Sequence, residues 1–201
     1  MNKVNTSTMI RTKDMTKVAM LSVIGFVLMY FQLPLTFVAP PFMKLDISDL
    51  PVLMGAFTMG PVYGIIIAGL KNLMHIIFKG TMTAGVGELS NFIISSTFAL
   101  VSSYIYRKHR TYKGAVLSMT VGVVAMTILA MASNYFVVFP LYGKVMPMEA
   151  IIAMGSAITP KITGLFTMMI YSVLPFNLIK GFTTSAVMML VYKKISPLFK
   201  N

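Results

Sequence analysis

The chain of 201 residues has no cysteine, no tryptophan and few charged residues. Without cysteine it forms no disulfide, carries no catalytic thiolate and holds no metal through sulfur. Charged residues make up 11% of the sequence, whereas soluble domains carry about 25%. Because a water-facing surface cannot be built from so few charges, we do not expect a soluble globular enzyme.

Groups that carry catalysis are also scarce. The sequence has five acidic residues and two histidines, which does not favour a histidine-based metal site. It contains neither GxxxxGK[ST] nor HExxH nor GxSxG, so the signatures of P-loop ATP hydrolysis, zinc proteolysis and serine hydrolysis are missing. We therefore expect a protein that is not itself an enzyme.

Hydrophobic residues dominate instead. They make up 57% of the chain, and the mean hydropathy is +0.81. Charge-free stretches form five long hydrophobic blocks, two of which are interrupted by a lysine, Lys71 or Lys180. A membrane-spanning helix needs about 20 apolar residues, so these blocks predict an integral membrane protein.

The basic residues indicate how the chain crosses the membrane. A net charge of +12 can indicate nucleic-acid binding, but these residues lie between apolar blocks, as the positive-inside rule predicts, and we expect no nucleic-acid partner. Basic residues near both ends place both termini in the cytoplasm, which requires an even number of spans. Dividing the second block at Gly60-Pro61 puts 11 basic residues inside and 4 outside, against 10 and 5 for a division at Pro175. We therefore expect the division at Gly60-Pro61.

The expected fold is an all-α integral membrane protein, a six-helix transmembrane bundle that forms one domain over residues 1–201, with cytoplasmic N- and C-termini. Helices are expected over residues 15–33, 48–58, 61–78, 88–107, 113–139 and 161–195. The second helix, at about 1.5 Å per residue, is too short to cross alone and must be buried against its neighbours. Outer loops are expected over residues 34–47, 79–87 and 140–160.

Polar side chains at membrane depth are costly and therefore mark candidate sites. Asn134 lies near the outer end of the fifth expected helix, and Asn177 and Lys180 share a face of the sixth. Glu88 opens the fourth helix, where the helix dipole favours a carboxylate. The alternatives are interhelical hydrogen bonds for the asparagines and snorkelling for Lys180. We expect these groups to form a pocket with apolar walls for a small, flat organic ligand.

Two further polar groups favour structural roles. Asp46 and Asp49 are spaced so that they offer two metal ligands, but capping of the short helix by Ser48 or Asp49 is the favoured interpretation. Lys71 and His75 share a face of the third helix. For this pair, packing or snorkelling to the interface is favoured over a functional role.

Several short motifs are spread along the chain. They are Lys44–Pro51 (KLDISDLP), Gly55-Ala56-Phe57 with Gly60-Pro61, Lys71–His75 (KNLMH), Gly80–Phe92 (GTMTAGVGELSNF), Asn134-Tyr-Phe and Pro140-Leu-Tyr142. Together, over residues 15–195, they resemble the riboflavin-binding S components of energy-coupling factor (ECF) transporters. The resemblance implies a multi-pass riboflavin receptor in a bacterial cell membrane, with six helices of which the second is short.

The resemblance also implies partners. These are one transmembrane coupling subunit and two cytoplasmic ATP-binding subunits, which act together with the S component in the lipid bilayer. ATP hydrolysis then belongs to the partners, so the missing Walker motif is expected. Riboflavin is the transported ligand, and no cofactor is expected.

The resemblance assigns site residues one by one. The family's pocket uses an Asn on helix 5 and an Asn-x-x-Lys on helix 6, which match Asn134, Asn177 and Lys180. An Asn amide offers a donor and an acceptor together, so both can read the uracil-like edge of the flavin, and the Lys180 ammonium can donate to a carbonyl. Glu88 and Asn91 are expected near the ribityl hydroxyls. Because the ligand is neutral, we expect a pocket short of charges.

Two other parts of the site follow from the family. Its first outer loop, here residues 38–47, closes over the ligand, and Met43 and Leu45 are expected to contact it. Its coupling subunit docks on an Ala-x-x-x-Ala face of helix 1. Here Ala19 is present, but the fourth residue on is Val23, and the nearby Ser22 keeps the face partly small. A docking role is expected for Ala19, Ser22 and Val23.

Other functions stay open at this point. The same fold can serve another vitamin, such as thiamine or biotin, although cationic thiamine needs a carboxylate and Glu88 is the one good candidate. A small membrane enzyme acting on lipids or phosphates needs clustered acids, which the sequence does not show. A stand-alone channel or secondary transporter is the fourth hypothesis, and the lack of an internal repeat argues against it.

Overall fold

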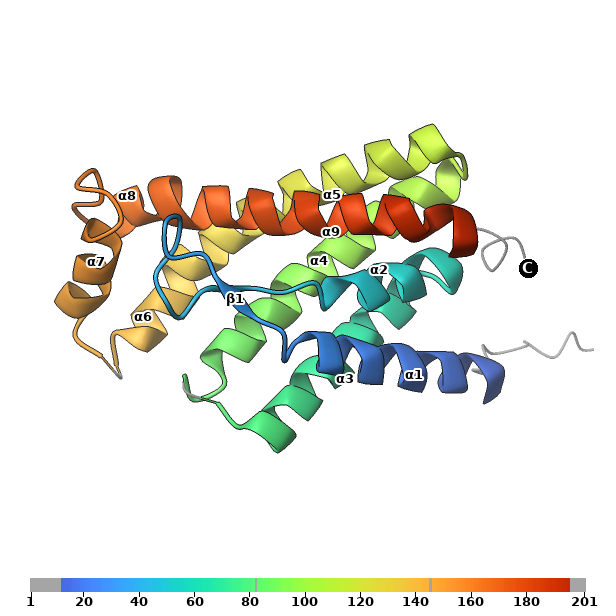
Figure 1. The fold of residues 1–201 in the computed structure, drawn as a ribbon, viewed down its shortest axis with the longest axis horizontal. Helices are drawn as coiled ribbons and strands as arrows, with labels where there is room; N and C mark the ends of the chain where they lie inside the picture. The colour runs from blue at the N-terminus through green and yellow to red at the C-terminus, as the bar shows by residue number, and fades with distance from the viewer. Residues whose placement is uncertain (1–11, 82, 145, 196–201) are drawn as a thin grey trace, which may run out of the picture.

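The computed structural model describes residues 12–81, 83–144 and 146–195, and these are mostly helical (Figure 1). The helical elements are α1 (Thr12–Leu28), α2 (Asp49–Thr58), α3 (Pro61–Lys79), α4 (Val86–Lys108), α5 (Tyr112–Ser133), α6 (Phe139–Tyr142), α7 (Met148–Ser156), α8 (Leu165–Met168) and α9 (Leu174–Ile195), with the π-helical segments η1 (Asn134–Val138) and η2 (Met169–Val173). Two short strands, β1 (Leu33–Pro34) and β2 (Lys44–Leu45), pair antiparallel in the loop between α1 and α2. We call this loop, predicted from the sequence over residues 34–47, the outer loop.

Four helical stretches are long and apolar enough to cross a membrane. They are Pro61–Lys79, Val86–Lys108, Tyr112–Tyr142 and Leu165–Val191. Large hydrophobic side chains point away from the bundle, including Phe78, Ile128 and Leu190, which are 69%, 63% and 80% exposed. A soluble protein rarely exposes apolar surface on this scale, and lipid is the solvent that suits it. The prediction of a helical membrane protein is confirmed.

The chain turns sharply between α2 and α3. Gly60 has a φ of 123°, which side-chain-bearing residues rarely adopt, and Pro61 opens α3 where a missing N–H costs nothing. α2 has only 10 residues, and its side chains Val52, Leu53 and Ala56 are fully buried against α1, α3 and α4. The predicted division at Gly60-Pro61 and the burial of the short helix are both confirmed.

Each of the two longest helical stretches contains one wide turn before a proline. The N–H groups of Phe139 and Leu174 donate to the carbonyl five residues earlier instead of four. The next residues are Pro140 and Pro175, which have no N–H and whose rings disturb a regular α-helix. The π-helical turn accommodates each proline, so the helix continues through it.

The structure corrects several predicted boundaries. The helix predicted over residues 15–33 ends at Leu28, and residues 33–34 form β1 instead. The helix predicted from residue 161 begins only at Leu165. After Leu28 the sequence stays apolar through Phe31, and hydropathy alone does not locate where an apolar segment stops being helical.

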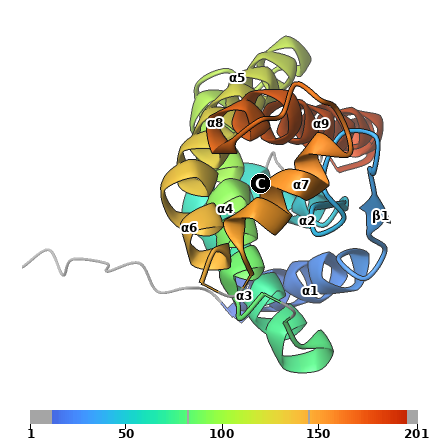
Figure 2. The same cartoon turned by 90° about the vertical axis from the view of Figure 1, so that its left-hand side faces the viewer.

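The predicted outer loop over residues 140–160 is not a plain loop, because it contains α7. Figure 2 looks onto this end of the bundle and shows α7 lying across it. α7 buries Ile151, and a side chain added at Gly155 would meet Met168 at 2.5 Å. The packing against α8 therefore stabilises a helix that is too short to predict from hydropathy.

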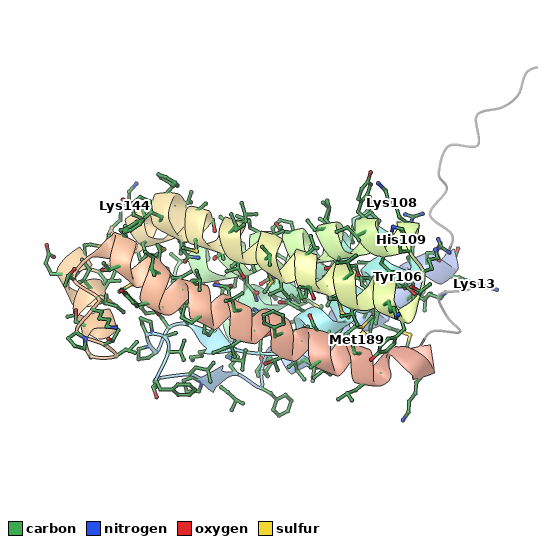
Figure 3. The ribbon with its side chains drawn as sticks, turned by 90° about the horizontal axis from the view of Figure 1, so that it is seen from above. Lys13, Tyr106, Lys108, His109, Lys144 and Met189 are labelled. Atoms are coloured by element: carbon green, nitrogen blue, oxygen red, sulfur yellow. The ribbon has the colours of Figure 1, made fainter. Side chains whose placement is uncertain are left out.

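The two ends of the bundle differ in charge. Lys13, Lys108 and His109 lie at one end and Lys144 lies at the other (Figure 3). The start of α1 and the end of α9 lie at the same end as the turn between α4 and α5 (Figure 1). Three basic residues that the sequence-based count includes lie outside the described residues; they are Lys3, Arg11 and Lys200.

Candidate functional site

Four charged residues are buried together inside the bundle. Asp46 precedes α2, Asp49 opens it, Lys71 lies on α3 and Lys180 lies on α9. Their exposed fractions are 4%, 1%, 0% and 6%. An unpaired charge at such depth is strongly destabilising, so buried charges persist only when they are paired. We call Asp46, Asp49, Lys71 and Lys180 the ion cluster.

Asp49 lies at the centre of the ion cluster. Its Oδ1 accepts a hydrogen bond from Lys71 Nζ at 2.5 Å and another from Ser95 Oγ on α4. Its Oδ2 lies 3.4 Å from Lys180 Nζ. Lys71 Nζ also donates to Ser48 Oγ at 2.7 Å. One carboxylate therefore connects α2 with α3, α4 and α9.

Three oxygens surround the ammonium of Lys180. Its Nζ donates to Asn91 Oδ1 at 3.0 Å and lies 3.4 Å from Asp49 Oδ2 and 3.6 Å from Asp46 Oδ2. The Asn91 contact is a hydrogen bond, and the two carboxylate contacts are ion pairs. Lys180 and Asn91, which the sequence places on different helices, are thus in direct contact.

These contacts correct earlier predictions. The Ser48 side chain makes no capping hydrogen bond, because its Oγ accepts from Lys71; the Ser48 N–H instead donates to Asp46 Oδ1 at 2.9 Å. Lys71 and Lys180 do not snorkel to the interface, because both ammonium groups are buried on carboxylates. The expectation of a site short of charges is also wrong, because the fold brings two carboxylates to Lys180.

Asn134 and Asn177 are buried amides fixed to their own helices. Their Nδ2 groups donate to the carbonyls of Ala130 at 2.7 Å and Val173 at 2.8 Å, four residues earlier in each case. The alternative of interhelical hydrogen bonds is therefore wrong. Among the described residues neither Oδ1 has a hydrogen-bond partner, so each amide keeps an acceptor and a second N–H for another molecule.

The fold gathers these polar groups in one half of the bundle. Asn134 begins η1, which packs against α4, and Asn91 lies near the start of α4. Asn177 and Lys180 lie in the first two turns of α9. η1 and the starts of α4 and α9 lie in the half of the bundle away from the turn between α4 and α5 (Figure 1). Of these four residues, Lys180 and Asn91 are in direct contact, and the shared ligand site of all four stays a prediction.

Glu88 belongs to a second buried group. Its Oε1 lies 3.3 Å from His75 Nδ1, and its Oε2 accepts from Thr81 Oγ1 at 3.0 Å. Glu88 lies in the first turn of α4, where the helix dipole stabilises a carboxylate. The structure therefore pairs Glu88 with His75 and Thr81, and it does not bring Glu88 to Lys180.

The outer loop packs over the end of the same helices. Phe42 makes edge-to-face contacts with Phe139 and Tyr142, with ring centroids 6.0 and 5.6 Å apart. Met43 is partly buried against the core, and Leu45 lies in β2 opposite Leu33. The loop leads to Asp46 of the ion cluster, so it contacts both α6 and α9.

The predicted docking face of α1 is only partly available. Ala19 is exposed and Val23 is 50% exposed, one turn apart. Ser22 is 1% exposed, and its Oγ donates to the Val18 carbonyl at 2.7 Å. Ser22 therefore faces the bundle, and its predicted contact with a partner is wrong for the fold as it stands.

The sequence reasoning missed Asp49, Lys71 and Ser95 as members of the site. A signal was present, because a lysine inside an apolar helix needs a buried acid as its partner. Asp46 and Asp49 are the acids next to an apolar helix, but helix capping gave them a sufficient local explanation.

Apolar helices around a small set of buried, partly unsatisfied polar groups define a membrane protein that can hold a polar organic molecule. The profile described as "ECF transporter, substrate-specific component" matches residues 13–192, and this chain belongs to that family. The chain is 34% identical to the riboflavin transporter RibU of Staphylococcus aureus (strain TCH60), over 95% of this chain and 94% of that one.

Two further comparisons agree. The chain is 32% identical to the riboflavin transporter FmnP of Bacillus subtilis (strain 168), over 93% of this chain and 94% of the relative. A solved structure reported under "Structure and mechanism of the S component of a bacterial ECF transporter" superposes with a TM-score of 0.73 and 35% identity, over 94% of this chain and 98% of that one.

Proposed function

We propose that this chain is the riboflavin-binding S component of an ECF-type vitamin uptake transporter and takes up its ligand from the extracellular side. The observation that carries the proposal is the pair of fixed amides, Asn134 and Asn177, each with a free acceptor and donor, together with the buried ammonium of Lys180, which lies on the same helix as Asn177 and donates to Asn91. Relatives at 34% and 32% identity over nearly their whole length are named riboflavin transporters, which supports the choice of ligand.

The chemistry of the flavin suits these groups. Its uracil-like edge presents a carbonyl, an N–H and a second carbonyl in a row. Asn134 and Asn177 supply both donors and acceptors for that edge, and Lys180 supplies a charged donor for a carbonyl. Asn91 and Glu88 are assigned to the ribityl end, and the loop residues Met43 and Leu45 cover the ligand.

The proposed topology has six helices in the membrane. They are α1, α2, α3, α4, the stretch from α5 to α6 and the stretch from α8 to α9. The end that carries Lys13, Lys108 and His109 (Figure 3) faces the cytoplasm under the positive-inside rule. Both termini then lie in the cytoplasm of a bacterial cell, and the outer loop faces the outside.

The chain needs partners to move its ligand. Its sequence has no nucleotide-binding motif, so ATP hydrolysis is assigned to two ATP-binding subunits that act through a transmembrane coupling subunit. The exposed Ala19 and Val23 on α1 are assigned to docking of that coupling subunit. Riboflavin is cargo in this proposal, and no resident cofactor is assigned.

Binding is tested on protein purified in detergent from cells grown in rich medium. We expect flavin absorbance in the purified protein and quenching of riboflavin fluorescence on titration, with no competition from thiamine or biotin. A colourless protein that does not quench riboflavin contradicts the proposal.

Transport is tested in vesicles. We expect riboflavin uptake only when the coupling and ATP-binding subunits and ATP are all present. Uptake by this chain alone, without ATP, favours the alternative of a stand-alone transporter.

A further inference from the structure

We infer that Asp49 is a positioning residue for Lys180, holding the ammonium in the direction in which it meets the ligand. The inference rests on the proposed function, because it concerns the ammonium assigned to a flavin carbonyl. Asp49 itself is assigned no contact with the ligand. It acts through its Oδ2, which lies 3.4 Å from Lys180 Nζ.

Lys180 needs such a partner to donate in one direction. A lysine side chain is a flexible stem with a freely rotating ammonium, and directed binding of a neutral ligand needs a donor whose position is already fixed. Asn91 on α4 provides one anchor at 3.0 Å. A single anchor leaves the ammonium free to rotate about it, whereas a second anchor on α2 fixes its position.

Asp49 is itself held in place. Its Oδ1 accepts from Lys71 on α3 and from Ser95 on α4, and Lys71 is held in turn by Ser48. Both lysines and the carboxylate are at most 6% exposed, so water does not compete for these contacts. With Oδ1 held by two helices, Oδ2 is directed at Lys180.

Charge balance alone does not account for the arrangement. The cluster contains two acids and two lysines, so simple pairing needs only Asp49 on Lys71 and Asp46 on Lys180. Instead, Asp49 Oδ2 also lies within ion-pair distance of Lys180, at 3.4 Å, beside Asp46 Oδ2 at 3.6 Å. Buried ion pairs are also weak contributors to stability, because apolar replacements often serve equally well.

The geometry indicates what changes when a ligand enters. Three protein oxygens lie around the Lys180 ammonium, one hydrogen-bonded and two as ion-pair partners, so a ligand carbonyl must take the place of one of them. Asp46 is the most distant of the three and lies at the end of the outer loop. We expect Asp49 and Asn91 to keep the ammonium in place while Asp46 gives way.

The test compares Lys71→Met with the double variant Asp49→Asn/Lys71→Met. The two proteins differ only at residue 49, and the double variant leaves Asp46 and Lys180 as a balanced pair. Riboflavin affinity is measured by fluorescence quenching, the absorption bands of bound riboflavin by difference spectroscopy, and folding by thermal unfolding without ligand. We expect the double variant to bind at least about tenfold more weakly than Lys71→Met, with flavin bands shifted toward those seen with Lys180→Met.

Equal affinity and equal spectra in the two variants contradict the inference, because Asp49 would then serve only to balance Lys71. Ser95→Ala is a second variant that leaves every charge in place. It loosens Asp49 Oδ1, and we expect about threefold weaker binding with a band shift in the same direction; an unchanged spectrum and affinity contradict the inference here too. If the wild-type protein itself does not respond to riboflavin, the proposed function fails instead.

Discussion

Two groups of buried polar side chains in this bundle differ in how completely their hydrogen-bonding capacity is used. In the ion cluster, Lys180 donates to Asn91 and forms ion pairs with two carboxylates, and Asp49 Oδ1 accepts from Lys71 and Ser95. In Asn134 and Asn177, one N–H of each amide is used within its own helix. The ion cluster holds helices together, and its side chains fix one another in place. The two amides instead keep a free acceptor and a free N–H that can bind a ligand.

This difference predicts which substitutions affect folding and which affect binding. The predictions below run from the largest to the smallest expected effect on riboflavin affinity. Each is measured on detergent-purified protein by fluorescence titration, with unfolding of the ligand-free protein recorded alongside.

Lys180→Met is expected to have the largest effect, because it removes a ligand contact and a member of the ion cluster at once. Asp46 and Asp49 then share one ammonium group instead of two, and the uncompensated buried charge destabilises the fold by about 3 kcal/mol. Riboflavin affinity falls at least about 100-fold. A variant with wild-type unfolding would show that the cluster does not use Lys180.

Asn177→Ala sharpens the comparison, because it should affect binding and spare the fold. Within the described residues, the amide makes one hydrogen bond, to the Val173 carbonyl of the adjoining η2, so the unfolding free energy changes by less than about 1 kcal/mol. The binding free energy of riboflavin weakens by about 2 kcal/mol, which lowers the affinity roughly 30-fold.

Asn72→Ala is the matched control for Asn177→Ala. Asn72 on α3 is 3% exposed, and its Nδ2 donates to the Ala68 carbonyl at 2.8 Å, four residues earlier. It has no assigned ligand contact, so riboflavin affinity should stay within about twofold of wild type. Equal losses in the two variants would mean that Asn177 acts only on folding.

Asp46→Asn is expected to have a smaller effect on binding. An asparagine keeps the acceptor for the Ser48 N–H, but the contact with Lys180, at 3.6 Å, loses its charge. We expect about a threefold change in affinity, mostly through a different rate of riboflavin dissociation, because the outer loop loses its attachment to α9. Stopped-flow fluorescence measures that rate. An unchanged rate would show that the contact between Asp46 and Lys180 does not control how the loop releases riboflavin.

Val23→Trp should leave affinity unchanged, because Val23 lies on the outer face of α1 and contacts neither polar group. If α1 docks the coupling subunit, uptake in vesicles with the full set of subunits should fall by at least about tenfold. Leu190→Trp, at a position 80% exposed on α9, is the matched control and should keep uptake. Normal uptake by Val23→Trp would place the docking face elsewhere.

Part of this molecule could be predicted from its sequence. The break at Gly60-Pro61 followed from the placement of basic residues, because the positive-inside rule depends only on how many Lys and Arg residues each loop carries. Asn134, Asn177 and Lys180 were singled out because polar side chains are rare at membrane depth. In these cases the physical cause lies in the sequence pattern itself.

The ion cluster could not be predicted in the same way. Asp46 and Asp49 lie at the start of a short helix, where helix capping explains them, and their partners Lys71 and Lys180 lie on other helices. The inward orientation of Ser22 was missed for a related reason. Both faces of α1 are apolar, so hydropathy does not distinguish the face toward lipid from the face toward the bundle. Pairings and orientations of this kind depend on how helices are arranged in space.

The ion cluster balances two carboxylates against two ammonium groups. A single elementary charge moved through the membrane potential gains or loses about 2.3 kcal/mol per 100 mV, whereas a balanced set moves without electrical work. A neutral flavin adds no charge to it. When the four groups move together through the bilayer, the ion cluster therefore adds no net electrical work of its own.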